Sequence, residues 1–377
     1  MRNQDTTDLK KIPVLGHAAI ATLLLCVATV GYTYRMPEFG RFFAGINDFL
    51  PRYTQARMVD TGQMYSTEAG YREQERAVGL HIVGAYHDRM PWQALLMAPL
   101  GRLPYLWAYS IWIALHLACF AAFICIWLLP RDCVLWGATF LPLAASIIVG
   151  QDTLLLAVCL AGALQLAETR RDLAAGLLLS LCTAKPHLFV LVPFALIAHR
   201  RWRMINGAVL GTVGLLTAGT AAAGLDWPVR LLAIMNTLGK ASGGDMDRRP
   251  SLFQFGVNEW TIGAALVLAL VFGFLIWRSR NLEMGIALAV LGGILIAPHT
   301  AIYDLPLLLV ALPALPLPSY GRWLRIALFT PVPYWALLNG APWSAVVPLM
   351  LLVAGGVSAL GSGRLKSAFQ PAGKRHA

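Results

Sequence analysis

The sequence predicts an all-α protein that crosses a membrane many times, and three observations support that prediction. Of the 377 residues, 58% are hydrophobic and only 13% are charged, and the mean hydropathy is +0.62. Soluble domains carry roughly a quarter charged residues. Apolar segments follow one another along most of the chain, and basic residues gather in the short connections between them. We therefore expect a single polytopic domain, 1–377, with about eleven to twelve transmembrane segments.

The apolar segments set the order of the predicted helices. The first follows Lys10 and Lys11 and lacks a small-residue cleavage site, so we expect a retained span rather than a signal peptide. Two longer polar stretches interrupt the series and are predicted to be large loops, at 34–104 and 225–259. The predicted segments are 14–33, 105–129, 134–149, 153–168, 173–184, 187–198, 204–224, 260–277, 284–297, 304–318, 323–339 and 344–360.

The charge of the short loops predicts the orientation, because cytoplasmic loops carry an excess of lysine and arginine. Basic clusters stand at Arg131, Arg170, Arg171, Arg200, Arg201, Arg203, Arg278, Arg280, Arg322 and Arg325. They predict a cytoplasmic N-terminus, 1–13, a cytoplasmic tail, 361–377, and two external long loops. The net charge of +11 has the same origin, so it predicts membrane orientation rather than a nucleic-acid partner.

The segment 173–198 is predicted to be broken in its middle. Basic residues flank both ends, so one continuous helix would leave one cluster on the wrong side. Lys185-Pro186-His187 interrupts the segment, and proline disrupts the helical hydrogen-bond ladder. Each half, with about twelve residues, is too short for a hydrocarbon core of about 30 Å. A re-entrant pair or two short passes would hold this break at membrane depth, facing water. A single proline-kinked helix is the alternative.

The first long loop is predicted to be amphipathic. Apolar residues recur at helical spacing from Phe42 to Tyr53, with polar Asn47, Asp48 and Arg52 between them. This pattern is typical of a helix that lies on a membrane surface.

Polar side chains gather at the connections that the topology predicts to be external. Ionisable groups at membrane depth are costly, so a cluster of them indicates a functional site. The candidate site residues are Asp48, Arg52, Gln151, Asp152, Lys185, His187, Arg248, Arg249, His299, Tyr303 and Asp304.

Asp48 is the candidate catalytic base among the acidic and amide residues. A carboxylate in that loop could take a proton from a hydroxyl as a new bond forms. The alternative is a carboxylate on the solvated face of an amphipathic helix. Gln151, Asp152 and Asp304 open apolar helices, where an Asp commonly serves as a helix cap. A capping role and contact with a substrate hydroxyl are compatible.

Lys185 and His187 are the candidate residues for binding an anion. A half-helix that begins after Pro186 points backbone N–H groups and its positive dipole end at the cavity, which suits a lipid phosphate. Further charge-assisted hydrogen bonds would come from Arg52, Arg248, Arg249 and His299. The alternatives are attraction to lipid headgroups for the Arg248-Arg249 pair and a core histidine or helix cap for His299.

A set of short motifs resembles one known family of membrane enzymes. In chain order they are Asp48…Tyr53…Gly62…Tyr65, Met90-Pro91-Trp92…Ala98-Pro99-Leu100, Gly150-Gln151, Ala175-Gly176…Lys185-Pro186…Arg200-Arg201-Trp202 and Ala297-Pro298-His299…Tyr303-Asp304. Their order and spacing, over about residues 45–310, resemble glycosyltransferase family 87, which includes mycobacterial polyprenyl-phosphate-mannose-dependent α-1,2-mannosyltransferases. Two points depart from the family pattern. Arg89-Met90-Pro91-Trp92 stands where a Tyr-Pro-Pro-like turn is expected, and Ala297 stands where serine is common.

The resemblance implies a GT-C-like bundle that transfers a hexose, such as mannose, with inversion at the sugar carbon. The donor would be a polyprenyl-phosphate-linked sugar and the acceptor a lipid or glycan, at the external face of a bacterial inner membrane and in contact with membrane lipids. Asp48 resembles the family's catalytic base, and Lys185 and His299 resemble groups near the donor phosphate.

No metal and no cofactor is expected. The sequence contains no glycine-rich phosphate loop, nucleophile elbow, zinc-ligand pair or Asp-x-Asp motif. Six cysteines lie mostly in apolar runs without metal-ligand spacing. A transferase that uses a nucleotide sugar would normally need a soluble nucleotide domain, and no segment fits one. A lipid-carried donor needs only a membrane groove and a phosphate clamp.

Two other functions are alternatives. A transporter or lipid-carrier flippase would need polar groups along a path to both membrane faces, whereas the non-basic polar groups here gather on the predicted external side. An O-antigen ligase or polymerase usually has a large external loop late in the chain, whereas the large loop here comes early. The polyprenyl-phosphate-dependent hexosyltransferase is the main prediction.

Overall fold

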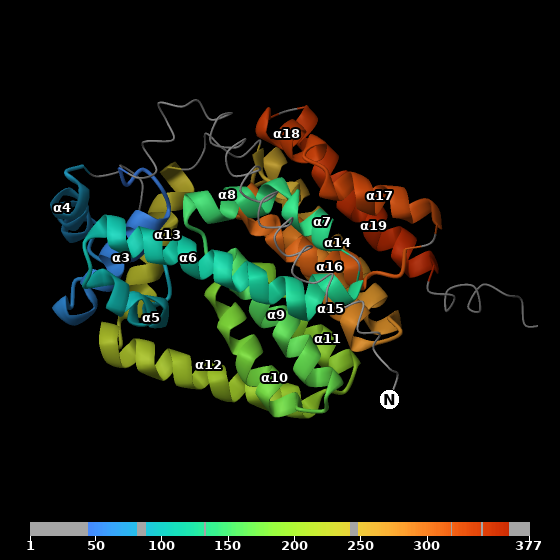
Figure 1. Cartoon of the computed structure of the whole chain (residues 1–377), viewed down its shortest axis with the longest axis horizontal. Helices are drawn as coiled ribbons and strands as arrows, with labels where there is room; N and C mark the ends of the chain where they lie inside the picture. The colour runs from blue at the N-terminus through green and yellow to red at the C-terminus, as the bar shows by residue number, and fades with distance from the viewer. Residues whose placement is uncertain are drawn as a thin grey trace, which may run out of the picture.

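The computed structural model describes the chain at 44–80, 88–131, 133–241, 248–317, 319–340 and 342–361 (Figure 1). Within these ranges the regular structure is helical and includes no strand. The predicted first span at 14–33, the N-terminal segment 1–13 and the tail from residue 362 lie outside the described residues. The all-α prediction is confirmed for the part of the chain that is described.

Helices of very different lengths make up the molecule, and 3₁₀ turns join several of them. The α-helices are α3 (Phe49–Arg57), α4 (Thr67–Val78), α5 (Pro91–Gly101), α6 (Tyr105–Phe123), α7 (Val134–Ala138), α8 (Leu141–Val149), α9 (Thr153–Glu168), α10 (Asp172–Leu179), α11 (Val192–Ala198), α12 (Trp202–Ala223), α13 (Trp227–Ala241), α14 (Glu259–Arg278), α15 (Leu282–Ile296), α16 (Leu308–Ala314), α17 (Ser319–Phe329), α18 (Val332–Leu338) and α19 (Val346–Gly361). The short turns used below are η4 (Ser180–Ala184), η5 (Pro186–Leu188), η8 (Leu252–Phe255) and η9 (Ile302–Leu307).

Three helical stretches in the described ranges are long and apolar enough to cross a membrane: Tyr105–Arg131, Trp202–Ala223 and Glu259–Arg278. The first of them is α6 extended by a π-helical turn. Shorter apolar helices are Thr153–Glu168, Asp172–Ala184, Leu282–Ile296, Ile302–Ala314 and Trp343–Ser358. The outer surface of α14 is apolar, with Leu266 and Leu270 exposed. These features support a membrane protein, while the number of spans and the GT-C arrangement remain predictions.

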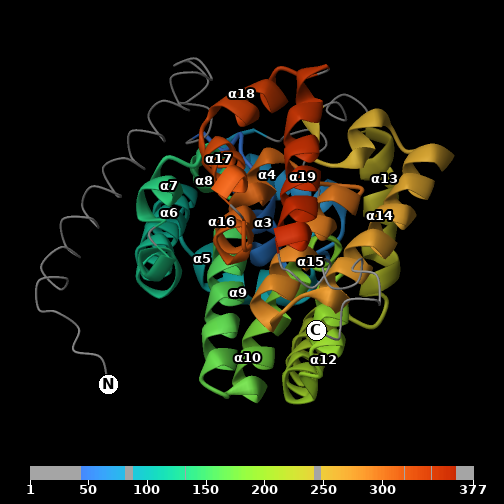
Figure 2. The same ribbon diagram turned by 90° about the vertical axis from the view of Figure 1, so that its right-hand side faces the viewer.

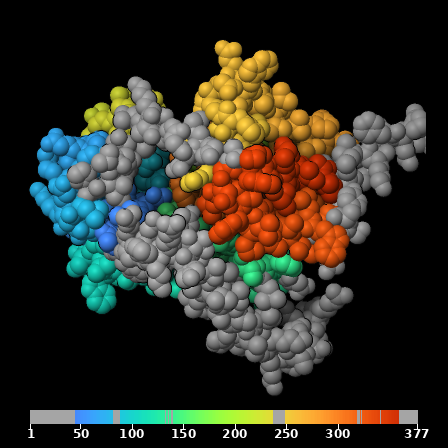
Figure 3. All heavy atoms as spheres, turned by 90° about the horizontal axis from the view of Figure 1, so that it is seen from above, coloured from blue at the N-terminus to red at the C-terminus, as the bar shows by residue number. Residues whose placement is uncertain are grey.

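The centre of the molecule is formed by α9, α15 and α16. Leu154, Leu288 and Leu309, one from each helix, are completely buried. In Figure 1, α3, α4 and α5 lie at one end of this core and α17, α18 and α19 at the other. Seen from above in Figure 3, α4 (blue) and the late helices (orange and red) likewise occupy opposite sides.

Facing glycines bring α10 and α12 together at backbone distance. A Cβ added at Gly176 would lie 2.0 Å from the carbonyl oxygen of Met204, and one added at Gly207 would lie 2.2 Å from that of Leu173. Small residues permit this approach where both helices are surrounded by apolar material. Larger residues would push the two helices apart. In Figure 2, α9, α10 and α12 form the lower part of the molecule.

The chain reverses direction at Lys185, in the middle of the segment predicted to be broken. α10 and η4 lead to this residue, and η5 and α11 lead away from it. The two ends of the segment meet again, since Arg201 Nη1 lies 3.4 Å from Asp172 Oδ2 and Arg201 Nη2 donates to the carbonyl of Ala167 at 3.2 Å. The structure therefore has the predicted broken pair rather than one kinked helix, with both basic flanks at the same end.

The helix that was predicted to lie on a membrane surface is packed inside the protein, so that placement is wrong for its described part. Phe49 and Leu50 of α3 are completely buried. The ring centroid of Phe49 lies 5.9 Å from that of Tyr105 and 5.4 Å from that of Tyr109, both on α6. An apolar helix face is equally suited to lipid and to aromatic side chains, so the periodicity alone could not separate the two.

Candidate active site

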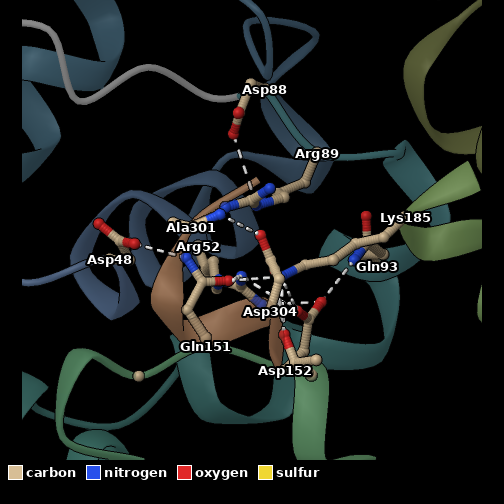
Figure 4. A network of polar contacts seen from close by, with 12 residues as sticks. Asp48, Arg52, Asp88, Arg89, Gln93, Gln151, Asp152, Lys185, Ala301 and Asp304 are labelled. Carbon is tan, nitrogen blue, oxygen red and sulfur yellow. Dashed lines mark hydrogen bonds and ion pairs between the residues drawn. The ribbon is translucent and has the colours of Figure 1, made fainter. Parts of the chain in front are cut away.

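Five separate parts of the chain meet in one polar network (Figure 4). They are the start of α3, the segment 88–93 at the start of α5, the turn before α9, the chain reversal at Lys185 and the turn η9. Gly150 makes the first approach possible, because its φ is +80° and a Cβ there would lie 2.6 Å from Phe49 Cβ. The backbone N–H of Asp48 then donates to the carbonyl of Val149 at 2.9 Å.

Asp48 turns its carboxylate toward this network instead of capping α3. The cap comes from Asn47, whose Oδ1 accepts from the backbone N–H groups of Phe49 and Leu50 at 2.9 and 3.0 Å. Asp48 makes no side-chain cap bond and is half-buried. Its Oδ2 accepts a hydrogen bond from Gln151 Nε2. The solvated-face alternative for Asp48 therefore does not describe this arrangement.

Gln151 links the carboxylate of Asp48 to two cations. While Nε2 donates to Asp48, Oε1 accepts from Arg52 Nη2 at 2.5 Å and from Lys185 Nζ at 2.9 Å. Its side chain is 1% exposed, so these bonds replace all of its hydration. One amide thus connects the predicted base with the predicted anion-binding residue.

All three N–H donors of the Lys185 ammonium have hydrogen-bond acceptors in this structure. Its ammonium donates to Gln151 Oε1 and Thr153 Oγ1, each at 2.9 Å, and to Asp304 Oδ1 at 2.6 Å. A lysine ammonium carries three N–H donors, so all of them have partners. The residue is 3% exposed, and a charge buried this deeply is tolerated when it is paired. Lys185 Nζ also lies over the ring of Tyr303, 5.7 Å from the ring centroid.

Asp152 is held by ion pairs and not by a capping bond. Its carboxylate meets Arg52 in a forked contact, with Nη1 to Oδ2 at 2.9 Å and Nη2 to Oδ1 at 3.2 Å. Gln93 Nε2 donates to Oδ2 at 3.0 Å, and Lys185 Nζ lies 3.4 Å from Oδ1. Burial by itself would raise the pKa of Asp152, but Arg52 and Lys185 outweigh it and hold that pKa well below its usual range.

Asp304 serves as both a helix cap and a network member. Its Oδ2 accepts from the backbone N–H of Ala301 at 3.0 Å, while Oδ1 accepts from Lys185. The expectation that a cap and a site role are compatible therefore fits this residue. Asp304 is 2% exposed.

The remaining predicted residues lie beside the network. The rings of His187 and His299 have centroids 6.4 Å apart, and His299 is exposed. Arg249 is buried and donates from Nη1 to the carbonyl of Pro298 at 2.7 Å. Arg248 is exposed, and the structure does not bring it into the charged network.

A groove of about 410 Å³ opens next to the network between α5, α6, α9 and η4. The polar part of its lining consists of Arg52, Gln55, Arg89, Gln93 and Asp152, and we call it the inner end because Arg52, Gln55 and Asp152 are buried. The rest of its lining is mostly apolar, from Trp92, Leu96, Met97, Leu100, Ile111, Leu115, Leu155 and Leu181. Two buried N–H groups at the groove, Arg52 Nε and Trp92 Nε1, have no hydrogen-bond partner among the described residues.

Sequence reasoning missed Arg89, Trp92 and Gln93 as site residues. Arg89 appeared only in a motif that departs from the family pattern, and Trp92 only within the motifs compared with that family. In the structure the carbonyl of Arg89 accepts from Gln55 Nε2 at 3.1 Å and Tyr65 Oη at 2.8 Å, which fixes its backbone. Its guanidinium lies 3.4 Å from Asp88 and lines the groove. An arginine directly before the start of α5 was the available signal.

In the part of the chain that the structure describes, no group of three or more His, Cys, Asp or Glu side chains is arranged to hold a metal ion. The site is instead a charged network with an apolar groove beside it.

Comparison with known proteins shows the family to which this site belongs. The model of glycosyltransferase family 87 matches residues 91–298, which include α5, the turn before α9 and the break at Lys185. A search of curated proteins found no match, and a search of solved structures found none. The matched stretch covers more than half of the 377 residues, and the long apolar helices are those of a membrane protein. The chain therefore belongs to glycosyltransferase family 87.

Proposed function

We propose that this protein transfers a hexose from a polyprenyl-phosphate-linked donor to a lipid or glycan acceptor at the external face of a bacterial inner membrane. The observation that carries the proposal is the groove, whose lining is mostly apolar and includes two arginines, Arg52 and Arg89. A lipid phosphate has the same division between a hydrocarbon chain and an anionic head. A nucleotide sugar offers no long apolar part to fill such a groove.

The inner end of the groove provides donors suited to a phosphate. Arg52 Nε and Trp92 Nε1 are buried, have no partner among the described residues and can only donate. Arg89 adds a guanidinium that lies 3.4 Å from Asp88. Oxygen atoms of a phosphate would satisfy all of these N–H groups through charge-assisted hydrogen bonds. In this proposal Arg89, Arg52 and Trp92 contact the phosphate.

Lys185 acts in this proposal as a positioning residue. Its N–H donors are committed to Gln151, Thr153 and Asp304, so it holds these groups in place rather than reaching a ligand. Because Gln151 also contacts Asp48, the buried ammonium fixes the position of the base through one intervening side chain.

Asp48 is the proposed base for the transfer step. The acceptor hydroxyl gives its proton to this carboxylate as its oxygen forms a bond to the anomeric carbon of the hexose. The bond from that carbon to the phosphate oxygen breaks, and polyprenyl phosphate leaves with the electron pair. The configuration at the carbon is inverted because attack and departure occur on opposite sides.

The test is transfer by the purified protein in lipid. Radiolabelled polyprenyl-phosphate hexoses and the nucleotide forms of the same hexoses are each incubated with a crude lipid extract of the host. Label should enter the extract from a lipid-linked donor and not from a nucleotide sugar. Transfer from nucleotide sugars alone would contradict the proposal.

The groove itself is tested by filling it. Leu115 lines the groove and is 42% exposed, so Leu115→Trp can narrow the groove without disturbing the core. We expect the donor KM to rise about tenfold, as for an overpacked site. The matched control is Leu266→Trp on α14, which adds the same ring to a leucine away from the groove and should leave the donor KM unchanged.

A further inference from the structure

Several buried polar side chains have no hydrogen-bond partner among the described residues, and three of them lie on the two segments that precede η9 and α14. They are Ser251, Gln254 and Thr300, which are 0%, 7% and 2% exposed. Both the amide nitrogen and the amide oxygen of Gln254 are unpartnered. We call these three residues the neutral cluster. Buried polar groups without partners are uncommon in native proteins, so three of them near one site require an explanation.

The neutral cluster adjoins the charged network through direct contacts. Ser251 and Gln254 share one turn, in which the Gln254 N–H donates to the Ser251 carbonyl at 3.2 Å. Two residues before Ser251, Arg249 bonds to the carbonyl of Pro298, which ties this turn to the segment that contains Thr300. Ala301, the residue after Thr300, donates its N–H to Asp304. Thr300 is therefore one residue along the chain from the network, and the turn with Ser251 and Gln254 is tied to the same segment through Arg249.

His187 connects the same region to the chain reversal. Its ring lies 6.4 Å from that of His299, the neighbour of Thr300 in the sequence. His187 Nε2 is buried and also has no partner among the described residues. His187 therefore adds a buried nitrogen without a described partner on the side of the break at Lys185.

The chemistry of these atoms indicates what they could bind. A hydroxyl and a carboxamide each donate and accept hydrogen bonds, and none of the three carries a charge. Sugar hydroxyls have the same dual character. An anion would leave the acceptor atoms of Ser251, Gln254 and Thr300 without donors, whereas a neutral, hydroxyl-rich ring would satisfy donors and acceptors together.

We propose that the neutral cluster binds the hydroxyl groups of a hexose and contributes to the choice of sugar. This inference rests on the function proposed above and adds to it a second binding region, opposite in character to the inner end of the groove. The hexose is either the one carried by the donor or one at the end of the acceptor, and the experiment distinguishes these sources.

The first measurement uses the opposite effects that the substitutions should have on stability and on transfer. Thr300→Val, Ser251→Ala and Gln254→Leu each remove an unpartnered buried polar group, so the melting temperature should stay the same or rise. Transfer from polyprenyl-phosphate mannose to the host lipid extract should nevertheless fall about tenfold in kcat/KM for each, because a hydrogen bond to the sugar is lost. Ser358→Ala on α19 is the matched control, since its hydroxyl is equally buried and unpartnered but lies away from the site. It should change neither stability nor transfer by much.

The second measurement identifies the source of the sugar and does not depend on turnover. Binding of polyprenyl-phosphate mannose and of bare polyprenyl phosphate is measured for the wild type and Thr300→Val. If the cluster binds the donor sugar, the variant should lose the extra affinity that mannose provides and keep its affinity for bare polyprenyl phosphate. If the cluster binds a sugar of the acceptor, donor binding should stay unchanged while the KM for the acceptor extract rises.

The proposal is overturned if all three variants keep wild-type kcat/KM and wild-type binding of both ligands. It is also overturned if Ser358→Ala lowers transfer as much as Thr300→Val does. Failure of the proposed function gives a different result. In that case the wild-type protein would bind neither polyprenyl phosphate nor polyprenyl-phosphate mannose, which would exclude a lipid-linked donor. The lower melting temperature of a misfolded variant would be seen directly and would contradict the expected stability.

Discussion

The inner end of the groove and the neutral cluster differ in the kind of hydrogen-bonding group that each leaves unpartnered. At the groove, the unpartnered atoms Arg52 Nε and Trp92 Nε1 can only donate. In the neutral cluster, the unpartnered atoms of Ser251, Gln254 and Thr300 donate and accept. Donors alone suit an anion, and mixed groups suit hydroxyls. The difference indicates two binding regions with separate tasks on one transferase.

The charged network lies between these regions and is almost fully satisfied. Every donor of Lys185 has a partner, and both oxygens of Asp152 and of Asp304 accept bonds. Completely paired charges of this kind fix the positions of the side chains, but their donors and acceptors are already used within the protein and are not available to a ligand. The comparison therefore separates side chains that position the site from side chains that are free to bind.

The largest expected effect concerns Asp48, whose carboxylate accepts a hydrogen bond from Gln151 at the edge of the network. Asp48→Asn keeps the size of the side chain but removes its basicity. We expect transfer to fall about 10²–10⁴-fold, the usual contribution of general base catalysis, while the melting temperature changes little. Radiolabel transfer and a thermal unfolding curve measure the two effects. Near wild-type turnover in this variant would exclude Asp48 as the base.

The next largest effect tests whether the network positions the site. Lys185→Met leaves Asp304 without its buried counter-charge, while Asp152 keeps Arg52, so we expect a loss of about 3–5 kcal/mol in the free energy of unfolding. Adding Asp304→Asn to this variant should recover part of that loss, as a double-mutant cycle would show. If Lys185→Met instead kept its stability and only the donor KM rose, Lys185 would be a phosphate ligand, as first predicted from the sequence.

The smallest expected effect is a change in donor KM, and it comes from comparing two tryptophans. The N–H of Trp92 has no partner among the described residues, whereas the N–H of Trp127 has one. Trp92→Phe removes the unpartnered donor at the groove, and we expect the donor KM to rise about tenfold or more, the scale of a hydrogen bond to a charged group. Trp127→Phe is the matched control, because Trp127 Nε1 donates to the carbonyl of Leu309 at 3.1 Å. That variant should lose stability without a change in donor KM. Equal changes in donor KM for both variants would remove Trp92 from the phosphate site.

Part of the site could be predicted from the sequence because its signals are local. Proline at position 186 breaks a helix wherever it folds, so the reversal beside Lys185 could be expected before any packing was known. The polar residues at the predicted external turns, Asp48, Gln151, Asp152 and Asp304, stood out because each interrupts apolar sequence. The structure brings these residues into one network.

Other features depended on partners that lie far away in the sequence. α3 was expected on a membrane surface, but aromatic side chains of α6 bury its apolar residues. Lys185 was expected to offer its charge to a phosphate, but Asp304, more than a hundred residues later, already accepts one of its hydrogen bonds. Neither result follows from the local pattern, because hydropathy gives the apolar face of a helix and not its neighbour.

The sequence by itself determined that the chain is helical and suited to a membrane, where its long apolar helices and its central break fall, and which polar residues are out of place in apolar surroundings. Those properties depend on composition and on backbone chemistry within a few residues. Only the tertiary structure decided which polar atoms are satisfied and which are not. Ser251, Gln254, Thr300 and Trp92 are ordinary residues in the sequence, and they become candidates for ligand binding only because folding removes water from them without supplying a partner.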